Sequence, residues 1–189
     1  VDKANALGLD TRFLNADELQ QLEPQTKIKA LGAILFKCDA HLYPQKLMHG
    51  LLNILKQSGV QLIPNEAVIR FEKKGNTVNR VITTKNAYDT DQVVIATGAW
   101  TREIASLVET KIPLMPGRGY SITLENSPYR INHPAVLMEG RVALTPMDGN
   151  KIRFGGTMEV VPTDTPPRYK RVEGIINAVK RYYTEFDIP

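Results

Sequence analysis

The architecture of this chain is best inferred from the segment Val93-Val94-Ile95-Ala96-Thr97-Gly98-Ala99-Trp100. A short apolar run such as its first four residues is typical of a strand buried on both faces of a parallel sheet. Gly98 then permits a tight turn or a close approach of the backbone to a ligand. Thr101 follows where it can cap a short helix. Strand, glycine turn and helix together predict free amides beside a ligand, although α/β domains without a ligand contain the same turn.

The residues before this segment alternate between helical and extended patterns. Asn15 and Glu18 form a helix-start signature, and Pro24 ends that helix. Pro44 suits the first turn of a longer helix that Gly59 terminates. The apolar face of this helix consists of Leu47, Leu51, Leu52 and Leu55. We expect strands at residues 31–36, at 60–63, and at 68–72 and 78–83, the last two forming a hairpin.

After Val108 the pattern changes to strands that alternate between apolar and polar residues. Pro113 and Pro116 bracket a linker. We expect strands from Arg118 through Leu124 and at residues 136–138, 142–144 and 151–158, with turns between them. The last helix has an expected buried face of Val172, Ile176, Val179 and Tyr183. The predicted fold class is α/β (α+β), an α/β layer followed by a mostly antiparallel sheet with helices.

Composition excludes several classes of protein. Hydrophobic residues make up 42% of the 189 residues and charged residues 23%, as in ordinary globular domains. The net charge of +4 is too small and scattered to indicate nucleic-acid binding. No apolar run approaches the length of about 18 residues that spans a membrane. Cys38 is the only cysteine, so no internal disulfide can form, and we expect a buried, unreactive thiol. His41 and His49 lack an acidic partner at metal-site spacing, so we predict no metal.

Several segments together resemble a known enzyme family. They are Leu22-Glu23-Pro24, Asp39-Ala40-His41-Leu42-Tyr43-Pro44, residues 93–100, Pro113-Leu114-Met115-Pro116-Gly117-Arg118-Gly119-Tyr120-Ser121 and Gly155-Gly156-Thr157-Met158-Glu159. Their order and spacing are similar to those of the D-amino-acid oxidase superfamily of FAD-dependent oxidoreductases, closest to the bacterial D-amino-acid dehydrogenases. The resemblance implies an enzyme that moves a hydride from the α-carbon of its small-molecule substrate, a D-amino acid or a related amine, to FAD. The imino acid then hydrolyses to a keto acid and ammonia. Most of this chemistry belongs to the cofactor.

The resemblance also implies roles for individual residues. Val68 corresponds to the residue whose backbone meets the adenine of FAD, and an ordinary strand residue is the alternative. Thr97, Gly98 and Trp100 would lie beside the ADP half, and Trp100 could instead fill the core. Arg118 and Gly119 correspond to a basic-Gly pair near the flavin ring, where a positive charge favours the anionic reduced flavin. The alternative for Arg118 is an exposed side chain beside a turn.

The expected catalytic residues are Arg118 and Tyr120. Tyr120 would line the substrate pocket, and core packing is the alternative. Gly155, Gly156 and Glu159 would shape the floor of that pocket, or the glycines would mark a bulge.

Two family motifs are missing from the chain. It has neither the opening G-x-G-x-x-G turn that holds the pyrophosphate nor a closing Gly-x-Arg-Pro segment that would hold the substrate carboxylate. We interpret the chain as the middle piece of a longer enzyme, with a substrate-domain edge at 1–38, part of the FAD-binding domain at 39–111 and the substrate-binding domain at 112–189. We expect this piece alone to carry no FAD, to be inactive and to self-associate.

Alternatives remain open at this stage. A glycine or sarcosine oxidase is the alternative within the enzyme class, and a non-catalytic ligand-binding or interaction domain is the alternative if the chain is complete. The substrate side chain and the electron acceptor, oxygen or a quinone, are also open. No nucleic-acid partner is expected. We expect a cytoplasmic protein, with peripheral attachment to the inner face of the membrane as a variant of that location.

Overall fold

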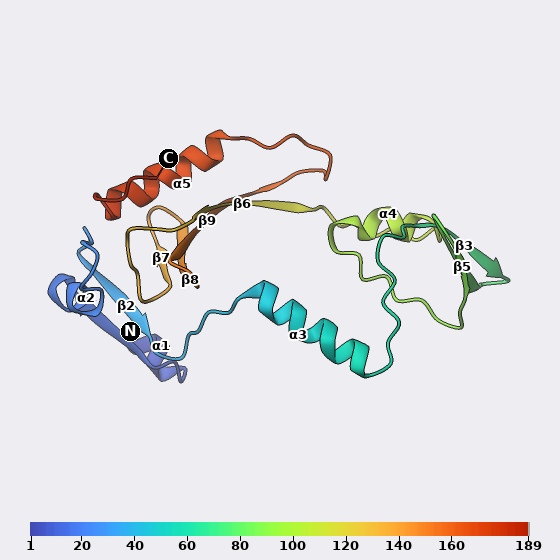
Figure 1. The fold of residues 1–189 in the computed structure, drawn as a ribbon, viewed down its shortest axis with the longest axis horizontal. Helices are drawn as coiled ribbons and strands as arrows, with labels where there is room; N and C mark the ends of the chain where they lie inside the picture. Colours follow the sequence, from blue (N-terminus) through green and yellow to red (C-terminus); the bar gives the residue numbers. More distant parts are fainter. Residues whose placement is uncertain (189) are drawn as a thin grey trace. The chain divides into compact units, whose positions relative to one another are not determined.

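The computed structural model describes residues 1–188, which combine helices with antiparallel sheets (Figure 1). The helices are α1 (Asp2–Ala6), α2 (Ala16–Leu22), α3 (Pro44–Gln57), α4 (Thr101–Ser106) and α5 (Lys170–Tyr182), and a 3₁₀ turn, η1, covers Gly98–Trp100. The strands are β1 (Thr11–Asn15), β2 (Gly32–Phe36), β3 (Val68–Lys74), β4 (Thr77–Thr83), β5 (Ala87–Asp89), β6 (Gly117–Leu124), β7 (Ala135–Leu137), β8 (Val142–Met147) and β9 (Lys151–Val160).

The chain divides into two compact units, each discontinuous in sequence. Unit 1 contains Val1–Pro44, Gly119–Met158 and the segment from Pro166 onward. Unit 2 contains Gln45–Arg118 and Glu159–Thr165.

In unit 1, α1 is followed by an antiparallel pair, β1 and β2, against which α2 packs. The predicted capping box is present at the start of α2. The Asn15 side chain accepts a hydrogen bond from the Glu18 amide, and the Glu18 carboxylate accepts one from the Asn15 amide, both at 2.9 Å. These bonds satisfy backbone donors that a helix start otherwise leaves unpaired.

The main core of unit 1 lies between α5 and a four-stranded sheet in the order β6-β9-β8-β7. The strands β7, β8 and β9 pair antiparallel, and α5 packs against β7 and β8 (Figure 1). The buried face of α5 is centred on Ile175, Ala178 and Val179. Of the predicted face, Val179 and Tyr183 are buried, whereas Val172 and Ile176 are half-buried. The core also contains Ile131, Leu137, Val142, Leu144, Ile152, Phe154, Phe186 and Ile188.

Unit 2 contains a three-stranded antiparallel sheet, β3-β4-β5. The predicted hairpin between β3 and β4 is confirmed, and its turn places Gly75 at a φ of 63°, which suits glycine. The predicted helix from Pro44 is also confirmed as α3. All of its residues are described and none is buried, so its leucine face is exposed to solvent.

Three sequence-based predictions are wrong. Neither Val93–Ala96 nor Val60–Ile63 forms a strand, and Val94 is 87% exposed. A strand exists only where another pairs with it, and within residues 1–188 no segment pairs with either run. Cys38 is exposed rather than buried, because it follows β2 in a turn instead of ending inside a sheet.

Candidate functional site

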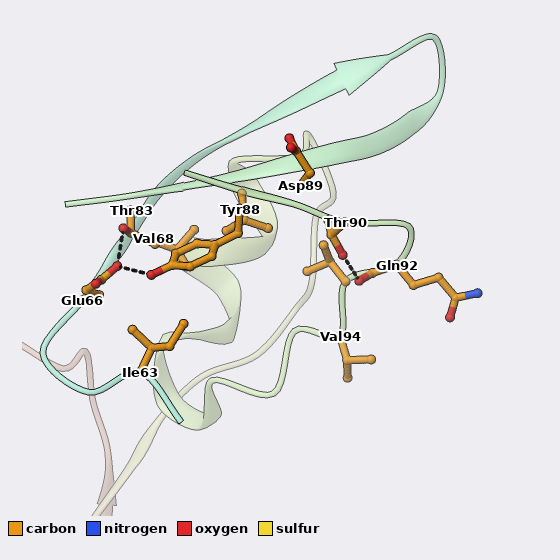
Figure 2. Close-up of a pocket in the computed structure, with 11 residues that line it drawn as sticks. Ile63, Glu66, Val68, Thr83, Tyr88, Asp89, Thr90, Gln92 and Val94 are labelled. Atoms are coloured by element: carbon orange, nitrogen blue, oxygen red, sulfur yellow. Dashed lines mark hydrogen bonds between the residues drawn. The ribbon is translucent and has the colours of Figure 1, made fainter. Parts of the chain in front are cut away.

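A cavity of about 420 Å³ lies within unit 2, beside the β3-β4-β5 sheet. Its apolar wall comes from Ile63, Val68, Val81, Val93 and Val94, and its polar wall includes Glu66, Thr83, Tyr88 and Gln92 (Figure 2). Apolar walls with a few fixed polar groups are typical of small-molecule sites, and this volume is in their usual range.

The polar wall is organised by the Glu66 carboxylate, which three side chains contact. Thr83 Oγ1 donates to Glu66 Oε2 at 2.7 Å, and Tyr88 Oη donates to the same oxygen at 3.0 Å (Figure 2). Asn86 Nδ2 donates to Glu66 Oε1 at 2.8 Å. The hydrogen bond from Thr83 is the main cause that lowers the pKa of Glu66, and those from Asn86 and Tyr88 add to it. Desolvation, followed by the bond to Glu66, raises the pKa of Tyr88. The site therefore presents an ionised, well-oriented acceptor at neutral pH.

The residues predicted to lie beside the ADP half of FAD come after the last lining residues of this cavity in the sequence. Val93 and Val94 line it, and Thr97 and η1 follow after two intervening residues in the chain. Gly98 has a φ of 55°, so the glycine supplies the turn that the sequence predicts. The prediction that Thr101 caps α4 is wrong, because Trp100 holds the N-cap position without a side-chain capping bond and Thr101 is the first helical residue. The Thr101 hydroxyl instead contacts the Thr97 hydroxyl at 3.3 Å. Trp100 is 57% exposed and so does not fill a core in this chain.

Arg118 lies at the start of β6 and is not the freely exposed side chain of the alternative interpretation. Its side chain is 23% exposed, and Nη1 lies 3.8 Å from Oε1 of buried Glu159. Nη2 donates to the Thr163 carbonyl oxygen at 3.3 Å. Nη1 itself is buried and has no hydrogen-bond partner. A buried donor without a partner is costly, so this atom is suited to an acceptor from a bound group.

The neighbouring residues Gly119 and Tyr120 belong to unit 1. A Cβ at Gly119 would meet no atom within 4 Å, so packing does not require a glycine there. Tyr120 is half-buried against the core, and its Oη accepts a hydrogen bond from the Arg168 amide at 2.8 Å.

A comparison with known protein families identifies the family of this chain. The model of the family described as FAD dependent oxidoreductase (DAO) matches residues 1–188. The chain belongs to the FAD dependent oxidoreductase family. The family resemblance predicted from the sequence is therefore confirmed.

Curated relatives of this oxidoreductase chain extend well beyond it. The chain is 28% identical over 187 residues to D-amino acid dehydrogenase from Neisseria gonorrhoeae, covering 94% of this chain and 43% of the relative. It is 26% identical over 181 residues to hydrogen cyanide synthase subunit HcnC from Pseudomonas aeruginosa, covering 95% of this chain and 43% of the relative. The chain thus spans less than half the length of these relatives.

Solved structures share the fold of this oxidoreductase chain. Glycine oxidase from Bacillus cereus superposes with a TM-score of 0.82 and 21% identity, covering 97% of this chain and 50% of that one. L-proline dehydrogenase from P. horikoshii superposes with a TM-score of 0.80 and 22% identity, covering 95% and 50%. At these identities the likeness concerns the fold alone.

Val68, which the sequence proposes for the site, lines the cavity, whereas the sequence does not predict the group formed by Glu66, Thr83 and Tyr88. Glu66 belongs to the same Glu66-Ala67-Val68 segment, and the turn after Thr83 brings Tyr88 back beside it. The available sequence signal was the polar residue at each of three positions: Glu66 just before β3, Thr83 at the end of β4 and Tyr88 in β5. Within residues 1–188, no cluster of three or more histidine, cysteine or acidic side chains is arranged to hold a metal ion, and no helix is long and apolar enough to cross a membrane.

Proposed function

We propose that this chain is part of an FAD-dependent oxidoreductase that oxidises D-amino acids to imino acids, and that the unit 2 cavity receives the adenine end of FAD. The observation that carries the proposal is the cavity itself. In a chain of an FAD-dependent family, it brings Val68 together with Val93 and Val94, shortly before the glycine turn. FAD, when bound, would supply the acceptor for the hydride from the α-carbon.

The residues of the cavity fit the adenine end of FAD. A purine has apolar faces and polar edges, which suits the apolar wall around Val68 and the polar groups opposite. The Glu66 carboxylate would fix the walls by holding Thr83 and Tyr88 in place. Thr97, Gly98 and Trp100 would line the path of the remaining ADP group, as the resemblance implies.

Arg118 would act near the flavin ring, with Gly119 giving close access beside it. The buried carboxylate of Glu159 offsets much of the guanidinium charge. Arg118 would therefore contribute a directed N–H donor at Nη1 more than a free positive charge. Tyr120 would line the substrate side.

The wider expectations are part of the same proposal. We assign 1–38 to an edge of the substrate domain, 39–111 to the FAD-binding domain and 112–189 to the substrate-binding domain. The leucine face of α3 and the exposed Val94 support self-association of the isolated chain through apolar surface. The free, exposed thiol of Cys38 is compatible with the reducing environment of the cytoplasm.

Filling the cavity tests the proposal in the complete enzyme. Val68→Phe should lower the molar ratio of bound flavin to protein, because the added ring occupies space that the adenine needs. Ile69→Phe is the matched control, since Ile69 is the next residue of β3, is 48% exposed and does not line the cavity. Equal flavin content in the two variants would contradict the assignment of the cavity.

A further inference from the structure

A second cavity of about 420 Å³ lies within unit 1, between β8, β9 and the first turns of α5. Its lining includes Arg141 beside β8, Thr157 on β9, and Arg171 and Gly174 on α5. None of the residues that we assign to FAD or to the substrate lines this cavity. It therefore calls for a separate explanation.

The lining of this cavity is positively charged. Arg141 and Arg171 both contribute to it, and none of the described lining residues is acidic. The Glu139 carboxylate does not line the cavity and accepts a hydrogen bond from the Tyr182 hydroxyl. A guanidinium presents parallel N–H groups that match the oxygens of a carboxylate or phosphate. The charge and the donor geometry both favour an oxyanion.

Arg171 is held at the cavity rather than extended into solvent. Its Nη1 donates to Thr157 Oγ1 at 2.7 Å and makes a longer contact of 3.4 Å with the Met158 carbonyl oxygen. Binding therefore costs less side-chain entropy than it would for a freely rotating arginine. Thr157 and Arg141 also have positive φ values of 54° and 50°. Such conformations cost roughly 1–3 kcal/mol each and cluster at ligand sites.

Gly174 shows that the cavity is kept open on its helix side. A glycine inside a helix costs about 1 kcal/mol relative to alanine, so it needs a reason. Packing explains the glycine at position 156, which lies on strand β9, because a Cβ there would lie 3.0 Å from Val142 Cγ2 and 3.2 Å from Ile175 Cγ1. At Gly174 a Cβ would meet no atom within 4 Å, so packing gives no reason. Gly174 instead leaves space one turn after Arg171, on the same face of α5.

We propose that this cavity binds the oxyanion group of a small molecule, a carboxylate or a phosphate, between Arg141 and Arg171 in the space that Gly174 leaves. The site is independent of the FAD function proposed above. All residues that line the cavity belong to unit 1, and so do the residues of the core beside it.

The proposal can be tested on the complete enzyme by NMR titration with sodium phosphate and, separately, with sodium acetate at constant ionic strength. Saturable shifts of the Thr157, Arg171 and Gly174 amides are expected with at least one of the two anions. Tighter binding of phosphate would identify a phosphorylated ligand, and tighter binding of acetate a carboxylate. Absence of saturable shifts with both anions would overturn the proposal.

Three variants locate the site. Arg171→Gln should raise the dissociation constant at least about tenfold, since hydrogen bonds to a charged group are lost. Gly174→Leu should cause a similar loss without changing the charge, and leucine favours the helix, so the variant should fold. Lys180→Gln removes one charge from an exposed position in the last turn of α5 and should bind like the parent protein. Unchanged binding in Gly174→Leu, or equal losses in Arg171→Gln and Lys180→Gln, would overturn the proposal.

Discussion

At the scale of single residues, buried polar groups in this chain are held by specific partners that the sequence does not reveal. Glu23 is 4% exposed, and its carboxylate accepts hydrogen bonds from the amides of Asn132 and His133, both at 2.8 Å. His133 Nδ1 lies 2.7 Å from the same carboxylate. More than a hundred residues separate these partners along the chain, so no local pattern predicts the contact. The sequence alone accordingly predicts no role for His133.

The buried phenol of Tyr183 should make the free energy of unfolding depend on pH, which gives a test of this buried region. Burial, and then the negative charge of Glu23, raise the pKa of Tyr183 from 10.0 to about 12. In the unfolded chain the phenol loses its proton first, so the folded state is stabilised below pH 10 and loses this stabilisation as the pH rises towards about 12. The free energy of unfolding should fall by up to about 1.4 kcal/mol per pH unit in that window. Urea unfolding at a series of pH values measures it.

Tyr183→Phe is the control, because it removes the titrating hydroxyl and keeps the ring that lies 4.8 Å from the ring of Phe186. The variant should lose less stability over the same window than the parent chain. Parallel pH profiles for the two proteins would contradict the raised pKa.

Arg118 gives a second prediction at this scale, in the complete enzyme. Arg118→Ala should lower turnover with D-amino acids more than it lowers FAD content, because we assign its donor to the flavin ring and not to the ADP half. Steady-state rates per bound flavin measure this effect. Unchanged rates in a flavin-loaded variant would rule out the role.

At the scale of helices and strands, elements with local signals were predicted correctly and those that depend on distant partners were not. The capping box at Asn15 and the Pro44 helix start are signals carried by a few neighbouring residues, and both elements form. The run Val93–Ala96 has strong apolar character, but no strand pairs with it in residues 1–188. The Glu66 cluster was missed because it depends on how β4, its following turn and β5 fold back together.

The β1–β2 pair gives a prediction at this scale. A Cβ at Gly32 would collide with the backbone oxygen of Leu14 and approach the Phe13 ring to 2.8 Å. Gly32→Ala should therefore force the strands apart and lower the free energy of unfolding by roughly 1–3 kcal/mol. Urea denaturation measures the loss.

Gly155→Ala is the matched control on β9, since a Cβ there meets no atom within 4 Å. It should change the free energy of unfolding by less than about 1 kcal/mol. Equal free energies of unfolding for Gly32→Ala and Gly155→Ala would contradict the claim that the β1–β2 pair requires a glycine at position 32.

At the scale of the molecule, the two units differ in how they are stabilised. The buried cluster that forms the core lies wholly in unit 1. In the described part of unit 2, the buried residues are Thr83, Ala105 and Glu159. Since the leucine face of α3 is also exposed, we expect the purified chain to lack flavin absorbance and to have a mass above that of the monomer in light scattering. A yellow monomer would contradict this expectation.

The central claim concerns the activity of the complete enzyme to which this chain contributes. Its most direct test is anaerobic mixing of the purified, FAD-loaded enzyme with D-alanine, L-alanine, glycine and sarcosine in turn, while the absorbance of the oxidised flavin is followed. The account predicts rapid bleaching with D-alanine and little with the other three. Bleaching by glycine or sarcosine but not by D-alanine, or by none of the four, would contradict it.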